Sequence, residues 1–215
     1  MGRWFWLYLD QMRLGISTDP LTSIISLAAF SLGMIVLLDL FELENRKIGY
    51  LICFLFLSNT AVCISLSYRY MSPTFGIAFL LSILSAWIIV KLKNDYFAVL
   101  FGAILIALTV GAYQSYIGCE CLALLGCIIY ASYDKRKSLK DILKLFIRCV
   151  ASNLLGGILY FAILNVHLKI FGVALSAYNG ANSYSIGDTI SNLSHSIRRT
   201  YEAIHMYFFN SVYLI

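Results

Sequence analysis

Apolar runs long enough to cross a lipid bilayer are the feature that most restricts how this chain can fold. A hydrocarbon core of about 30 Å needs about 20 apolar residues in a helix. Six runs approach that length, at residues 21–41, 48–68, 75–90, 96–113, 119–133 and 146–166. Because a segment in lipid must satisfy its own backbone polar groups, each run is expected to be a helix. The sequence therefore predicts an all-α integral membrane protein, a polytopic helical bundle.

The composition agrees with lipid as the solvent. The 215 residues are 60% hydrophobic and 13% charged, whereas a water-soluble domain is about half apolar and about a quarter charged. The chain has two prolines and no Gly/Ser linker, so residues 1–215 are expected to form a single transmembrane domain.

Basic residues are concentrated in alternate connections between the runs. They are Arg46 and Lys47, then Lys91 and Lys93, then Lys135, Arg136, Lys137, Lys140 and Lys144. The intervening connections hold Arg69 and, around residues 117–120, no cation. The positive-inside rule places the lysine-rich connections in the cytoplasm. The net charge of +5 therefore indicates topology, and a nucleic-acid partner is not expected.

The two ends of the chain are expected to lie on the other side of the membrane. Residues 1–19 predict an outer interfacial helix, since Trp4 and Phe5 supply apolar area while Arg3, Asp10 and Arg13 share a face. Asp19 can cap the first span, and Pro20 suits its first helical position. Residues 203–215 begin an apolar run too short to cross. Both ends of the chain therefore look cut, and we expect the chain to be an internal piece of a longer protein.

Four outer pieces offer polar groups: residues 1–19, 69–74, 114–120 and 169–199. The last is rich in Gly, Ser, Asn and Tyr, which suits sugar binding and equally suits an ordinary connecting loop. Arg69 has a guanidinium fork that matches a phosphate or carboxylate, or it anchors a helix end by snorkelling. Gln114 either holds helices together or faces a polar cavity.

Carboxylates are few on the outer side, and none has the setting of an obvious general base. They are Asp10, Asp19, Glu120 and Asp188. Cys119 and Cys121 flank Glu120, but a zinc site needs a second ligand pair, and none is visible at a suitable distance. We expect neither a metal nor a cofactor.

Four short motifs, in order along the chain, resemble those of the type II family of serotype-converting membrane glucosyltransferases, which decorate bacterial O-antigen. Gly2-Arg3-Trp4 is similar to the Gly-Arg step after that family's first outer loop. Asp19-Pro20-Leu21 resembles its Pro-Leu entry into the next span. Ser67-Tyr68-Arg69-Tyr70 resembles its Ser-Tyr-Arg-aromatic motif, and Tyr113-Gln114 its Tyr-Gln helix end.

The resemblance implies a GT-C-like glycosyltransferase in the bacterial inner membrane, multi-pass, with an extracytoplasmic active face. Its donor would be a polyprenyl-phosphate-linked glucose or another hexose, and its acceptor a surface glycan such as O-antigen. Arg3 and Arg69 would bind the donor phosphate, and Tyr70, Tyr113 and Gln114 would line the substrate site.

The chain departs from that family in two places. The acidic pair of the first outer loop would fall upstream of Met1, so the expected catalytic base lies there and the bare chain is expected to be inactive. Asp10 and Glu120 are the candidates within the chain. Met71 stands where the family commonly has Asp. The alternatives are a lipid-linked sugar flippase or transporter, which mid-span charges and broken helices would favour, and a non-catalytic assembly subunit.

Overall fold

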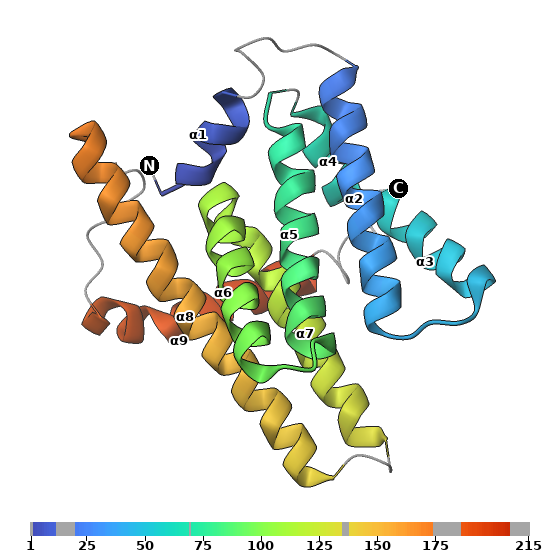
Figure 1. Cartoon of the computed structure of the whole chain (residues 1–215). Coiled ribbons are helices and arrows are strands. Elements are labelled where there is room, and N and C mark those ends of the chain that lie inside the picture. The colour runs from blue at the N-terminus through green and yellow to red at the C-terminus, as the bar shows by residue number, and fades with distance from the viewer. Residues whose placement is uncertain (1, 12–19, 69, 135–137, 174–185, 207–215) are drawn as a thin grey trace. The chain divides into compact units, whose positions relative to one another are not determined.

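The computed structural model describes residues 2–11, 20–68, 70–134, 138–173 and 186–206, and these are helical with short connections and no strand (Figure 1). The elements are α1 (Trp4–Gln11), α2 (Leu21–Leu40), α3 (Arg46–Leu57), α4 (Thr60–Ser67), α5 (Ser72–Lys91), α6 (Asp95–Ala112), the 3-10 helix η1 (Gln114–Tyr116), α7 (Ile117–Tyr133), α8 (Leu139–Phe171) and α9 (Ile186–His205). Residues 2–172 form one compact unit that holds α1 to α8.

The second unit contributes a single described helix, α9. It begins inside the expected outer segment 169–199, of which residues 174–185 are outside the described part, and it continues beyond that segment to His205. Leu193, Ile197 and Tyr201 follow one another at four-residue spacing on one face and are exposed. The part of this segment that is described is therefore an amphipathic helix, a feature that its Gly- and Ser-rich composition did not indicate.

Five of the described helices are long and apolar enough to cross a membrane: α2, α5, α6, α7 together with η1, and α8. The pair α3 and α4 would bring the number to six if it is one span with a 53° bend. The chain is thus an all-α polytopic membrane protein. The expected run 48–68 is divided because Asn59 starts a new helix inside it, its side chain accepting a hydrogen bond from the Ala61 N–H at 2.8 Å.

The helix α8 is longer than the run 146–166 that hydropathy indicated. Its 33 residues span about 50 Å at 1.5 Å per residue, well over the thickness of the hydrocarbon core. It begins at a capping box in which Ser138 and Asp141 satisfy each other's backbone N–H groups. It ends at Gly172, whose φ of 60° is the left-handed conformation of a helix C-cap. Both ends are set by local sequence.

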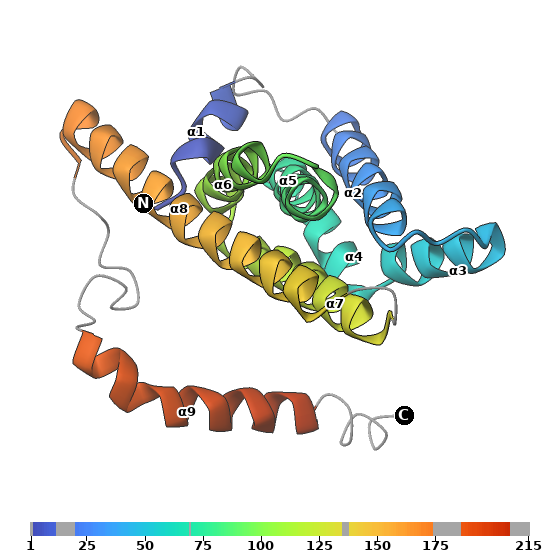
Figure 2. The same ribbon diagram turned by 60° about the horizontal axis from the view of Figure 1, so that its bottom comes forward.

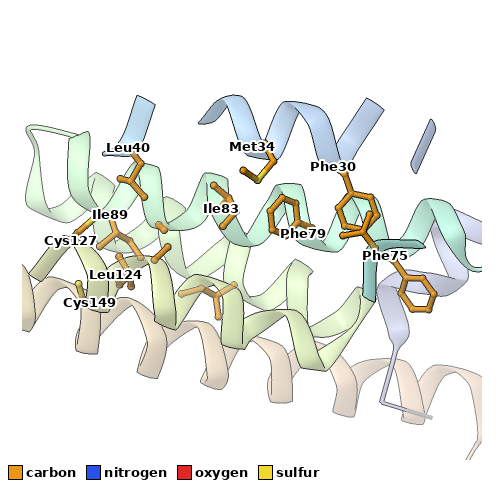
Figure 3. Packing of buried hydrophobic residues seen from close by; sticks show 14 residues of the cluster. Phe30, Met34, Leu40, Phe75, Phe79, Ile83, Ile89, Leu124, Cys127 and Cys149 are labelled. Atoms are coloured by element: carbon orange, nitrogen blue, oxygen red, sulfur yellow. The ribbon is translucent and has the colours of Figure 1, made fainter. Parts of the chain in front are cut away.

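The centre of the bundle is α5, with α2 and α6 on either side of it and α7 also packed against it (Figure 2). Phe30 and Met34 of α2 lie against Phe79 and Ile83 of α5, and all four side chains are at most 3% exposed (Figure 3). Gly76 permits this approach, because a Cβ at that position would lie 2.5 Å from the Ser26 backbone oxygen. Small residues at such crossings let helix backbones pack closely in lipid.

The end of α5 and the start of α8, which carry Lys91 and Lys144, lie at one end of the bundle, the lower end in Figure 1. Lys91, at the end of α5, forms an ion pair with Glu42, just after α2, at 2.6 Å. Lys144 near the start of α8 pairs with Asp95 at the start of α6 at 2.8 Å. Because consecutive spans run in opposite directions, α1 and the junction of α6 with η1 are brought to the other end, which we call the upper end after Figure 1.

The first helix is only partly what the sequence indicated. Residues 12–19, which include Arg13 and Asp19, lie outside the described residues, and α1 covers Trp4–Gln11. Trp4 is 6% exposed and packs with Ala107 of α6 and Tyr160 of α8, so one side of α1 is docked on the bundle. Pro20 occupies the N-cap of α2, one residue before the predicted first helical position.

Candidate functional site

The residues of the Gly-Arg and Tyr-Gln motifs meet at the upper end of the bundle, joined by a tyrosine from α8. The Gln114 side-chain amide donates a hydrogen bond to the Tyr160 hydroxyl at 3.0 Å. The same hydroxyl donates to the backbone oxygen of Gly2 at 2.8 Å. Tyr160 is 5% exposed, and a buried tyrosine hydroxyl is normally paired in this way. Three segments distant in sequence therefore converge on one oxygen atom.

Arg3 extends from this junction over the ring of Tyr113. Its guanidinium carbon lies 4.2 Å from the ring centroid, a cation–π contact. Within the described ranges, no carboxylate forms an ion pair with Arg3. The Tyr113 ring covers one face of the guanidinium. The N–H groups along the edge of the guanidinium stay accessible and can bind a phosphate with two parallel hydrogen bonds. The arrangement holds a partly exposed cation ready for an anion.

The position of Arg3 is set by the docking of α1. Trp4 lies in contact with α6 at Gly111, where an added Cβ would come 2.7 Å from the indole ring. The Trp4 ring also stacks on His167 of α8, with ring centroids 5.5 Å apart. Tyr8 donates a hydrogen bond to His167 Nε2 at 2.7 Å, and His167 Nδ1 donates to the Ile163 backbone oxygen at 3.0 Å, a tautomer assigned from these partners. Arg3 is thus fixed by α6 and α8 together.

Aromatic rings connect the Tyr-Gln motif with the Ser-Tyr-Arg-aromatic motif. Phe75 has its ring centroid 4.8 Å from that of Tyr113 and 6.1 Å from that of Tyr68. Tyr116 of η1 lies beside Tyr113, with ring centroids 5.9 Å apart. We call these four residues the aromatic row. Tyr70 follows in the turn before α5 and is 55% exposed, while Arg69 lies outside the described residues.

The two candidate bases within the chain differ in their surroundings. Glu120 of α7 is 1% exposed; it accepts a hydrogen bond from the Asn153 side chain of α8 at 3.2 Å, and the Cys121 thiol lies 3.4 Å from its other oxygen. This places it inside the α7–α8 contact. Asp10 is half-buried near the end of α1. Among the described residues, no group of three His, Cys, Asp or Glu side chains is placed to hold a metal ion.

Sequence reasoning did not identify Tyr160, Phe75 or His167 as members of this site. Tyr160 and His167 carry one signal, since each is a polar side chain within or just after the apolar run 146–166, where such a group needs a partner. The partner itself could not be identified, because hydropathy does not show which helices face each other. Phe75 is one of 14 phenylalanines, and its sequence context does not distinguish it.

Comparison with known protein families gives a match that covers the chain from end to end. The family model described as "Glucosyl transferase GtrII" matches residues 1–215. No curated protein and no solved structure matches the chain. The matched range contains the residues that meet at the upper end of the bundle, and the family supports a glucosyltransferase role. A chain matched over its whole length by this family model belongs to the GtrII glucosyl transferase family.

Proposed function

We propose that the chain is a membrane glycosyltransferase that moves glucose, or another hexose, from a polyprenyl-phosphate donor to a surface glycan such as O-antigen. The observation that carries the proposal is the stacking of Arg3 on Tyr113 at 4.2 Å, beside Gln114 and the aromatic row. A cation that suits the donor phosphate and rings that suit the sugar face lie together at the upper end of the helix bundle. Family membership supports the glucosyl group as the one transferred.

In the proposed reaction, an acceptor hydroxyl attacks the anomeric carbon of the donor sugar. The new glycosidic bond forms, the bond from the anomeric carbon to the phosphate oxygen breaks, and polyprenyl phosphate leaves with the electron pair. Arg3 stabilises the charge that develops on the leaving phosphate, and Arg69 is proposed to act with it. Tyr70, Tyr113 and Gln114 line the sugar site, and the hydroxyl proton passes to a carboxylate base.

The active face is proposed to be extracytoplasmic, in the bacterial inner membrane. The support is the distribution of cations: the end of α5 and the start of α8, with Lys91 and Lys144, lie at the lower end, and the residues around Arg3 lie at the upper end (Figure 1). Positive connections face the cytoplasm in multi-pass proteins. The GT-C-like architecture stays a prediction.

We propose that Glu120 has a structural role in the contact between α7 and α8 and is not the base that takes the acceptor proton. Glu120→Gln is expected to leave sugar transfer unchanged, because a glutamine can still accept the hydrogen bond from Asn153 at this buried position. Sugar transfer is measured with the purified Glu120→Gln gene product. Asp10→Asn, the same kind of change at the other candidate base, is measured beside it. Loss of transfer by a folded Glu120→Gln protein would instead make Glu120 the base.

The donor class is tested with membrane vesicles that contain the gene product. Radiolabelled polyprenyl-phosphate glucose is expected to transfer its label to lipopolysaccharide acceptor without any added nucleotide sugar. Vesicles lacking the gene product are the control. Label that reaches the acceptor only from a nucleotide-linked donor would contradict the proposal.

One observation favours the alternative of a flippase, namely the 53° bend between α3 and α4, since broken helices are common in transporters. The same vesicles separate the two functions. A flippase moves the intact lipid-linked sugar between leaflets and leaves the sugar–phosphate bond unbroken, whereas a transferase releases polyprenyl phosphate in proportion to the sugar transferred.

A further inference from the structure

A groove of about 560 Å³ runs between α6 and α8, starting at the lower end of the bundle, away from Arg3 and Gln114. Its charged rim is lined by Asp95 at the start of α6 and by Lys140, Lys144 and Arg148 of α8, of which Arg148 reaches back to the Leu92 backbone oxygen. Its remaining wall is apolar and includes Leu100, Ile147 and Leu155. None of these residues takes part in the proposed transfer reaction.

The groove changes from charged to apolar along the direction in which the helices cross the membrane. The positions of Lys140, Lys144 and Arg148 follow one another every four residues, so they form one line on α8. From Lys144 to Leu155 the helix rises about 16 Å, close to half the thickness of a bilayer core of about 30 Å. The polarity of the wall therefore follows that of a lipid molecule in one leaflet, with its head at the rim and a tail along the helices.

The rim has more positive charge than its own carboxylate can neutralise. Asp95 pairs with Lys144 at 2.8 Å and with Arg148 at 3.5 Å, and Arg148 also donates to the Leu92 backbone oxygen at 2.8 Å. The Arg148 Nε–H is buried and has no hydrogen-bond partner among the described residues. Lys140 has no ion-pair partner in the described part of the chain. Three cations against one carboxylate leave an excess of two positive charges.

We propose that this groove binds an anionic phospholipid of the adjoining leaflet. Lys140 and Lys144 bind the phosphate at the rim, and an acyl chain lies along Leu100, Ile147 and Leu155. Charge complementarity selects the anionic headgroup. A zwitterionic headgroup carries a positive group of its own, which the excess positive charge of the rim repels. The apolar wall selects a lipid over a free phosphate, which would leave most of the groove unfilled.

Native mass spectrometry of the gene product with bound lipid tests the proposal. The unaltered protein is expected to retain phosphatidylglycerol at concentrations where phosphatidylcholine is lost. Lys140→Gln/Lys144→Gln is expected to weaken phosphatidylglycerol binding roughly tenfold or more, from the attraction of each lysine for an anionic lipid. Arg46→Gln/Lys47→Gln, which removes two exposed cations at the start of α3, is the matched control and is expected to bind as the unaltered protein does.

A second variant tests the apolar part without changing any charge. Ala151→Phe places a ring in the groove wall and is expected to lower phosphatidylglycerol retention while the thermal midpoint in lipid-free detergent stays the same. It also keeps the proposal testable should the double lysine variant fail to fold. Equal retention of phosphatidylcholine, displacement of phosphatidylglycerol by inorganic phosphate, or full binding by both variants would each overturn the proposal. Failure of sugar transfer would not, because the groove is separate from Arg3.

Discussion

Replacing Arg3 with alanine in the gene product is expected to lower sugar transfer about 10²- to 10³-fold, the usual effect of removing one preorganised donor to developing negative charge. The guanidinium is held 4.2 Å from the centre of the Tyr113 ring, so its N–H edge is already oriented when the donor phosphate arrives. Initial rates with saturating polyprenyl-phosphate glucose measure the effect.

Two further variants make this result specific. Arg3→Lys keeps the charge but has no planar fork, so it is expected to restore only part of the rate. Arg46→Ala removes an exposed arginine at the start of α3, outside the candidate site, and is expected to leave the rate unchanged. If Arg3→Ala transferred sugar at the unaltered rate, the leaving phosphate would have to be bound by other groups and the proposed role of Arg3 would be wrong.

The largest loss of stability is expected from Gly76→Val, at the contact between α2 and α5. A Cβ on residue 76 would lie 2.5 Å from the Ser26 backbone oxygen and 2.9 Å from the Ser26 Cα. Backbone atoms cannot rotate away as a side chain can, so the two helices must separate. The Ser26 hydroxyl would then lose its hydrogen bond to the Ser72 backbone oxygen, now 2.7 Å long. Overpacking of this kind costs about 1–3 kcal/mol or more.

The loss of stability is measured as a lower thermal midpoint in detergent, with the loss of monodisperse protein on heating as the signal. Gly157→Ala is the matched control, because a Cβ on that helical glycine would meet no heavy atom of another described element within 4 Å. It is expected to unfold at the same temperature as the unaltered protein or slightly above it, since alanine is the better helix former. Equal midpoints for Gly76→Val and the unaltered chain would show that α2 and α5 do not pack this closely.

Much of the candidate site followed from short motifs, but its assembly did not. The order of Gly2-Arg3 and Tyr113-Gln114 along the chain, with the alternation of cations, predicted that both would lie on the same side of the membrane. The structure brings Arg3 onto Tyr113 and joins Gln114 to Gly2 through Tyr160. The burial of Glu120 against Asn153 was not predicted, because a carboxylate next to a loop gives the same sequence signal whether it faces solvent or a neighbouring helix.

The sequence by itself determined where most of the long apolar helices lie, although the run 48–68 is divided into α3 and α4, and it determined several helix ends. Hydropathy, loop charge and capping residues such as Ser138 depend on residues that are close together along the chain, so the sequence alone shows them. Only the tertiary structure decided which faces meet: that α5 lies at the centre, that Trp4 docks on α6, and that Tyr160 binds both Gly2 and Gln114. The physical reason is that lipid is as apolar as a helix interface, so a leucine facing a lipid tail and a leucine facing another helix look alike in sequence.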